Sequence, residues 1–124
     1  MSVSGQQNVI LCVDDEQMSL KCRQLILERA GYKVFTALNS ELGLELFRHN
    51  HIDLVITDHL LPGRNGCDMA AEMKRDAPSI PIMLLSGLAD SPDTAGVIDM
   101  FVMKGSPPPE FLDTIASMLN QKEV

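Results

Sequence analysis

The chain has 124 residues and a net charge of −7, with 10 lysines and arginines against 17 aspartates and glutamates. This length suits one domain over residues 1–124, with an ordered core over about 8–121, and hydrophobic and charged shares of 45% and 22% exclude a disordered tail or a coiled coil. The negative charge argues against direct binding to nucleic acid or to an anionic membrane surface.

Five short apolar segments recur along the chain and are predicted to be β-strands. Three of them are almost continuously apolar, which is typical of parallel strands covered on both faces. Longer segments with helical spacing separate them, so the sequence predicts an α/β fold. The predicted strands are Val9–Val13, Tyr32–Ala37, Leu54–Thr57, Ile80–Leu85 and Met100–Met103.

Helices are predicted between these strands. The first is expected to begin after Asp15, a good N-cap, and to end at Gly31. Cys22 and Ile26 share one face of this helix, and Leu20 points nearly opposite to Cys22, which makes Leu20 a candidate for an exposed position. The other helices are expected over Ser40–His49, over Gly66–Asp76, over a short stretch between Asp90 and Val97, and from the Pro107-Pro108-Pro109 run onward.

The three cysteines form no Cys-x-x-Cys pair and stand in apolar or helical stretches. They are therefore expected to be reduced core residues rather than disulfide partners or zinc ligands. The longest apolar run, Val9–Val13, is far shorter than the ~20 residues that cross a bilayer. The first seven residues lack the basic flank and apolar core of a signal peptide, so a cytoplasmic location is expected.

Polar side chains stand at the carboxyl ends of four predicted strands. Asp14 and Asp15 follow the first strand, Asp58 follows the third, Ser86 follows the fourth and Lys104 follows the fifth. In an open parallel sheet these ends line one crevice, which is the usual ligand site of doubly wound folds. Taken singly, each residue has a structural explanation as a helix cap, a turn former, a loop residue or a surface charge.

Together these groups suit a phosphoryl group and a hard cation. Three carboxylates in one crevice repel each other, and protonation or a bound divalent cation relieves the repulsion. Oxygen ligands of this kind suit Mg²⁺. Lys104 can neutralise one phosphoryl oxygen, and the hydroxyl of Ser86 can donate a hydrogen bond to another. One carboxylate would be the attacked or attacking group, because carboxylates form acyl phosphates.

The segments that carry these residues resemble the CheY-like receiver domains of two-component response regulators. The resemblance implies a doubly wound, flavodoxin-like parallel sheet of five strands in the order 2-1-3-4-5. It also implies a phosphorylation-activated signalling switch rather than an enzyme that acts on a separate substrate. The resemblance covers about the whole chain and rests on Val9–Glu16, Asp53–Asp58, Leu61–Gly66, Pro81–Gly87 and Phe101–Lys104.

The resemblance also implies a role for each site residue. Asp58 would be the phosphoacceptor, taking a phosphoryl group from a phosphohistidine on a sensor histidine kinase or a histidine phosphotransfer protein. Asp15, Asp58 and the main-chain carbonyl oxygen of Leu60 would bind Mg²⁺. Asp14 would act through a metal-bound water, and Lys104 would pair with the phosphoryl group.

Ser86 and Phe101 match the switch pair of this family. In that scheme the Ser86 hydroxyl moves toward the new phosphoryl group and the Phe101 ring turns inward, which signals to a downstream protein effector; a homodimer is also compatible. One departure is that Lys104 stands only 18 positions after Ser86, roughly one helical turn fewer than in typical receivers. A shortened fourth helix is therefore expected.

Three other functions are alternatives to a phosphorylation-activated switch. A magnesium-dependent phosphatase with an aspartate nucleophile would need an acid two residues after it, where Leu60 stands. A flavodoxin-like nucleotide or flavin binder would need a hydroxyl- and glycine-rich loop after the first strand, where Asp14–Gln17 stands. A degenerate receiver that acts as a phosphorylation-independent interaction module is the alternative that the shortened fourth helix keeps open.

Overall fold

The computed structural model describes residues 7–59, 61, 66–87 and 96–122. Within these ranges strands and helices alternate along the chain up to β4. The elements are β1 (Val9–Val13), α1 (Gln17–Arg29), β2 (Lys33–Ala37), α2 (Ser40–His49), β3 (Leu54–Asp58), α3 (Gly66–Asp76), β4 (Ile82–Ser86), β5 (Met100–Met103) and α4 (Pro108–Lys122).

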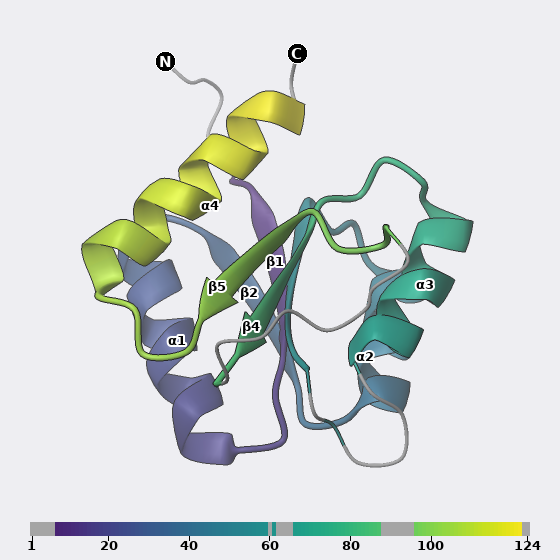
Figure 1. The fold of residues 1–124 in the computed structure, drawn as a ribbon, viewed down its shortest axis with the longest axis horizontal. Helices are drawn as coiled ribbons and strands as arrows, with labels where there is room; N and C mark the ends of the chain where they lie inside the picture. The colour runs from purple at the N-terminus through teal and green to yellow at the C-terminus, as the bar shows by residue number, and fades with distance from the viewer. Residues whose placement is uncertain (1–6, 60, 62–65, 88–95, 123–124) are drawn as a thin grey trace.

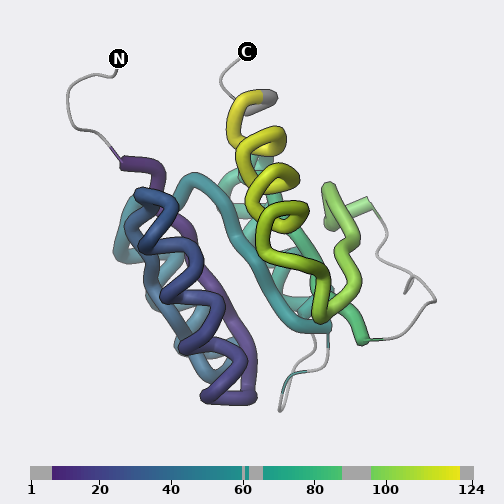
Figure 2. The backbone as a smooth tube through the Cα atoms, turned by 90° about the vertical axis from the view of Figure 1, so that its left-hand side faces the viewer, coloured from purple at the N-terminus to yellow at the C-terminus, as the bar shows by residue number. Residues whose placement is uncertain are grey.

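The five strands form one parallel sheet in the order β2-β1-β3-β4-β5. Helices α1 and α4 cover one face of the sheet, and α2 and α3 cover the other (Figures 1 and 2). The predicted doubly wound fold and its strand order are confirmed. The short helix predicted between Asp90 and Val97 falls mainly on residues 88–95, outside the described residues, and the label α4 belongs to the C-terminal helix.

Two apolar cores lie on the two faces of the sheet. On β1, Ile10 and Cys12 belong to the core under α1 and α4, whereas Leu11 and Val13 belong to the core under α2 and α3. Successive side chains of a strand point to opposite faces, so a strand covered on both sides must be apolar at every position. This is why β1 reads as an uninterrupted apolar run.

The predicted orientation of α1 was wrong. Leu20 is buried in the core under α1 and α4 together with Leu27, whereas Cys22 is exposed. Leu20 and Leu27 lie seven residues apart, and Arg23 stands between them on the same side of the helix. The charged Arg23 interrupts the apolar stripe of the buried face, and this interruption misled the helical-wheel interpretation.

Of the two predicted ends of α1, the N-cap was wrong and the stop at Gly31 agrees with the structure. The N-cap of α1 is Glu16 and not Asp15, because the Glu16 carboxylate accepts a hydrogen bond of 2.7 Å from the amide of Ser19. The side-chain hydroxyl of Ser19, followed by its amide, lowers the pKa of Glu16 by hydrogen bonding to the ionised carboxylate. After the helix, Gly31 has a φ of +100°, which favours glycine, in agreement with its expected role as a stop.

The expectation for the cysteines holds for two of the three. Cys12 and Cys67 are buried, and burial raises the pKa of the Cys12 thiol to about 12, so that it stays protonated. Cys22 is exposed, because its side chain borders an open groove between α1 and α4 instead of packing into the core. None of the helices in the described ranges combines the length and apolar character that crossing a membrane requires.

Candidate functional site

The register of the sheet brings the predicted polar residues to one edge. Val13 at the end of β1 pairs with Thr57 of β3, and Asp58 pairs with Leu85 of β4. Ser86 at the end of β4 pairs with Met103 of β5. The residues that follow or end these strands, Asp14, Asp15, Asp58, Ser86 and Lys104, therefore meet at the carboxyl edge of the sheet.

Three carboxylates gather at this edge. Asp14, Asp15 and Asp58 each offer an oxygen, and these oxygens lie within 4.8 Å of one another. Asp14 is 0% exposed and Asp58 is 8% exposed, whereas Asp15 faces solvent. Carboxylate oxygens at this spacing suit Mg²⁺, which is a hard cation. The solvent-facing side of the cluster, next to Asp15, leaves space for water or phosphate oxygens as further ligands.

Lys104 is the cation nearest to the phosphoacceptor candidate among the described residues. Its Nζ donates to Oδ2 of Asp58 at 3.1 Å and lies 3.6 Å from Oδ2 of Asp14. The other oxygen of Asp58, Oδ1, accepts from the amide of His59 at 2.9 Å. These donors hold the Asp58 carboxylate in one orientation, and Lys104 is placed to neutralise negative charge beside it.

A second cation, Arg23, reaches the cluster from α1. Its Nη1 donates to Oδ2 of Asp14 at 3.2 Å, and the Arg23 side chain is only 13% exposed. We did not predict this contact from the sequence. The available signal was a charged residue on the buried side of α1, three residues after Leu20 and four before Leu27, where a strand-facing helix normally carries an apolar side chain.

The other candidate residues belong to β4, β5 and the segment after β3. Ser86 ends β4, and its carbonyl oxygen accepts from the amide of Lys104 at 2.8 Å. Phe101 lies on β5 with an exposed side chain. Leu60, whose carbonyl oxygen is a predicted Mg²⁺ ligand, lies outside the described residues.

Comparison with known proteins decides the family. A family model described as the response regulator receiver domain matches residues 10–116. This chain is a receiver domain of that family. It is 33% identical over 116 residues to the response regulator SaeR of Staphylococcus aureus (strain USA300), covering 90% of this chain and 50% of SaeR. The chain spans about half or less of the length of the curated relatives that it matches.

Solved structures agree with this assignment. A CheY-like receiver domain protein from Methanospirillum hungatei JF-1 has a TM-score of 0.89 at 26% identity, covering 95% of this chain and 98% of that one. The response regulator TrrA of Thermotoga maritima, in complex with Mg²⁺-BeF, has a TM-score of 0.85 at 29% identity, covering 90% of this chain and 99% of that one.

Gly66 packs against the main chain of the phosphoacceptor candidate. A Cβ atom at this position would overlap the carbonyl oxygen of Asp58 and lie 3.1 Å from Oγ1 of Thr57. The amide of Gly66 also donates to the carbonyl oxygen of His59 at 2.9 Å. Only a residue without a side chain fits between α3 and the end of β3, so Gly66 fixes how closely this helix approaches the site of the receiver.

Gly66→Ala is therefore expected to lower the free energy of unfolding by about 1–3 kcal/mol and to displace Asp58. The added Cβ atom would overlap the main-chain carbonyl oxygen of Asp58, which cannot move aside as a side chain can. Denaturant unfolding measures the first effect. Gly43→Ala is the matched comparison: its Cβ would meet the side chains of Val13 and Met69 at 3.0 and 3.1 Å, which can shift, and alanine favours the helix. Equal unfolding free energies for the two variants would contradict this account.

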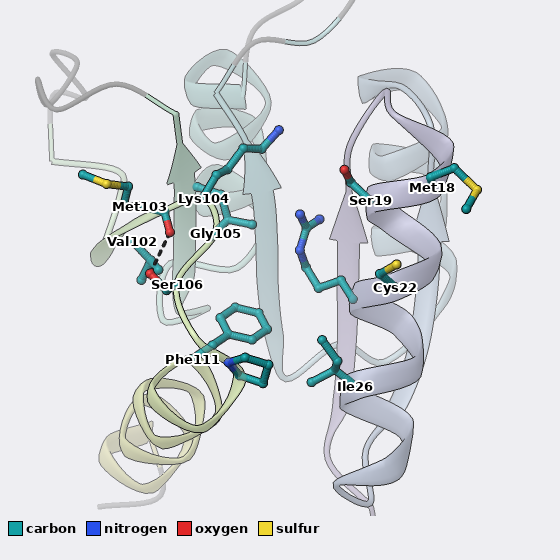
Figure 3. Close-up of a pocket in the computed structure, with 13 residues that line it drawn as sticks. Met18, Ser19, Cys22, Ile26, Val102, Met103, Lys104, Gly105, Ser106 and Phe111 are labelled. Carbon is teal, nitrogen blue, oxygen red and sulfur yellow. Dashed lines mark hydrogen bonds between the residues drawn. The ribbon is translucent and has the colours of Figure 1, made fainter.

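An apolar groove of about 340 Å³ opens beside the site, between α1 and α4. Ile26 of α1 and Phe111 of α4 face one another across it, and Lys104 lies at the end nearest the carboxyl edge of the sheet (Figure 3). Met18, at the start of α1, is 66% exposed on its rim. The receiver thus presents an apolar surface directly adjacent to the cation that contacts Asp58.

Proposed function

We propose that this receiver domain, spanning residues 1–124, is a phosphorylation-activated switch in which Asp58 accepts a phosphoryl group. The donor is a phosphohistidine on a sensor histidine kinase or a histidine phosphotransfer protein. The observation that carries the proposal is the nearly buried Asp58 carboxylate, held 3.1 Å from Nζ of Lys104 and within 4.8 Å of the oxygens of two further carboxylates.

The transfer exchanges one bond for another. An oxygen of Asp58 forms a bond to phosphorus, the bond between phosphorus and the donor imidazole nitrogen breaks, and the departing nitrogen keeps the electron pair and takes up a proton. Lys104 offsets charge on the phosphoryl oxygens, and the Ser86 hydroxyl donates to one of them. The product is an aspartyl phosphate, which serves as a signal.

The carboxylate cluster supports a role for Mg²⁺ in this transfer. Asp15, Asp58 and the carbonyl oxygen of Leu60 would hold the ion, and Asp14 would contact one of its waters. When bound, Mg²⁺ neutralises the charge that gathers between the carboxylates and the phosphoryl oxygens. The carboxylate oxygens within 4.8 Å of one another support this assignment, and a relative was solved in complex with Mg²⁺-BeF.

Phosphorylation would then change the surface of the domain. A phosphoryl group adds roughly −1.5 to −2 charge and strong acceptor oxygens, so donors nearby reorganise around it. Ser86 would move toward it and the exposed ring of Phe101 would turn inward. A downstream protein effector reads this change on the β5 side of the sheet.

The test is intact mass after incubation with phosphoramidate in the presence of Mg²⁺ or of EDTA. We expect a phosphate-sized adduct that is stable in acid, is lost in base and forms only with Mg²⁺. A folded protein that forms no adduct under either condition would contradict the proposal and favour the phosphorylation-independent interaction module.

The groove between α1 and α4 is where we propose that the phosphodonor protein binds. It is lined by apolar side chains from both helices and from β5, among them Ile26, Val102 and Phe111. An amphipathic helix of the donor fits such a groove, because its apolar face replaces water there. The groove ends at Lys104, so a histidine on that helix would be presented toward Asp58.

Met18→Asp is expected to slow transfer from a phosphorylated histidine-containing donor by about tenfold, because a charge on an apolar contact opposes its desolvation. The donor for this experiment is chosen from a panel of phosphorylated histidine-containing proteins as the one that transfers its phosphoryl group to the parent domain fastest. Phosphorylation by phosphoramidate should be unchanged. The matched control is Leu25→Asp, which alters a residue of the same helix that is 51% exposed and does not line the groove. Equal transfer rates for the two variants would place the donor elsewhere.

A further inference from the structure

Arg23 is shared by the groove and the carboxylate cluster. It lines the groove between α1 and α4, and its Nη1 donates to Oδ2 of Asp14 at 3.2 Å. The Arg23 side chain is 13% exposed and the Asp14 side chain is fully buried. Because little water separates or screens this pair, its charge acts on the cluster more strongly than a surface charge would.

Asp14 is also held by donors other than Arg23. Its Oδ1 accepts from the amide of Glu16 at 3.0 Å, and Nζ of Lys104 lies 3.6 Å from its Oδ2. Removal of the guanidinium would therefore leave the Asp14 carboxylate oriented by the main chain and accompanied by one cation. The principal loss would be one positive charge beside three carboxylates.

We infer that Arg23 is an internal counter-ion that lowers the affinity of the carboxylate cluster for Mg²⁺. It occupies an oxygen of Asp14 and offsets part of the negative charge that attracts a divalent cation. Arg23 is thus a positioning residue that acts through Asp14. The inference rests on the proposed function, because it concerns the same site, and it fixes the sign of a measurable effect: loss of the charge strengthens Mg²⁺ binding.

The experiment is titration of Mg²⁺ by isothermal calorimetry into the full chain and into single variants. Arg23→Gln and Arg23→Met should bind Mg²⁺ about tenfold more tightly, since a unit positive charge 3.2 Å from a carboxylate of the cluster is removed. Arg23→Lys keeps the charge and should restore the parent dissociation constant. Lys21→Gln removes the same charge from an exposed position of the same helix and should change it by less than about twofold, because solvent screens that charge.

The sign of the change separates this inference from a merely structural role for Arg23. Weaker or unchanged Mg²⁺ binding in folded Arg23→Gln, with circular dichroism matching the parent, would overturn it. The Arg23→Met variant decides the matter if Arg23→Gln does not fold, because methionine suits the apolar groove. If the parent does not bind Mg²⁺ but both variants do, the inference stands. If no form binds the ion, the inference and the Mg²⁺ part of the proposed function both fail.

Discussion

Asp58→Asn is expected to abolish the phosphate adduct while leaving the domain folded. Asparagine has the size of aspartate, but its amide lacks the anionic oxygen that forms the acyl phosphate. The substitution also removes one of three mutually repelling carboxylates, so we expect no loss of stability from the cluster itself. Intact mass after phosphoramidate treatment with Mg²⁺ measures the adduct, and circular dichroism establishes that the variant folds.

The matched control for this variant is Asp76→Asn. Asp76 ends α3 and pairs with Arg48 at 2.8 Å, away from the carboxyl edge of the sheet. This variant should form the adduct at the parent level. A phosphate adduct of equal yield in Asp58→Asn and Asp76→Asn would show that another side chain accepts the phosphoryl group, which would contradict the assignment of Asp58.

Lys104→Ala is expected to slow phosphorylation by phosphoramidate on the order of 100-fold, the loss typical of removing one donor that stabilises developing charge. Nζ of Lys104 lies 3.1 Å from Asp58 and is the nearest cation to that carboxylate among the described side chains. The initial rate of adduct formation, followed by intact mass, is the measurement. Lys104→Arg should recover part of the rate, because it restores the charge with a different shape.

A second readout distinguishes a charge effect from unfolding. Lys104→Ala should still bind Mg²⁺, because it leaves all three carboxylates in place and removes a competing positive charge. A variant that binds Mg²⁺ and is phosphorylated within about twofold of the parent rate would mean that Lys104 does not stabilise the transferring group.

The strands and most helices could be predicted because their sequences carry strong local signals. A strand covered on both faces must be apolar throughout, and β1 has the predicted bounds Val9–Val13. The edge strand β5 also has its predicted bounds, Met100–Met103, although most of its residues are exposed. The candidate site was predictable for a related reason. Parallel strands end at one edge, so polar residues directly after Val13, Thr57 and Met103 had to converge.

What the sequence did not reveal depends on contacts between distant segments. An arginine normally lies on an exposed helix face, yet the guanidinium of Arg23 is neutralised by the buried Asp14, which permits a charge on the buried side of α1. Once Arg23 is assigned to that side, Leu20 and Leu27 follow it inward. The groove could not be predicted from the sequence either, because its lining residues come from α1, β5 and α4, which are brought together only in the folded domain.

Location of the phosphoryl group on the chain is the most direct test of this account. Borohydride reduces an acyl phosphate to an alcohol, so a phosphorylated aspartate becomes homoserine, which peptide mass mapping identifies by position. After treatment with phosphoramidate and Mg²⁺, we expect homoserine at position 58. Homoserine at position 14 or 15, or an adduct with no homoserine at any aspartate, would contradict the claim that Asp58 is the phosphoacceptor.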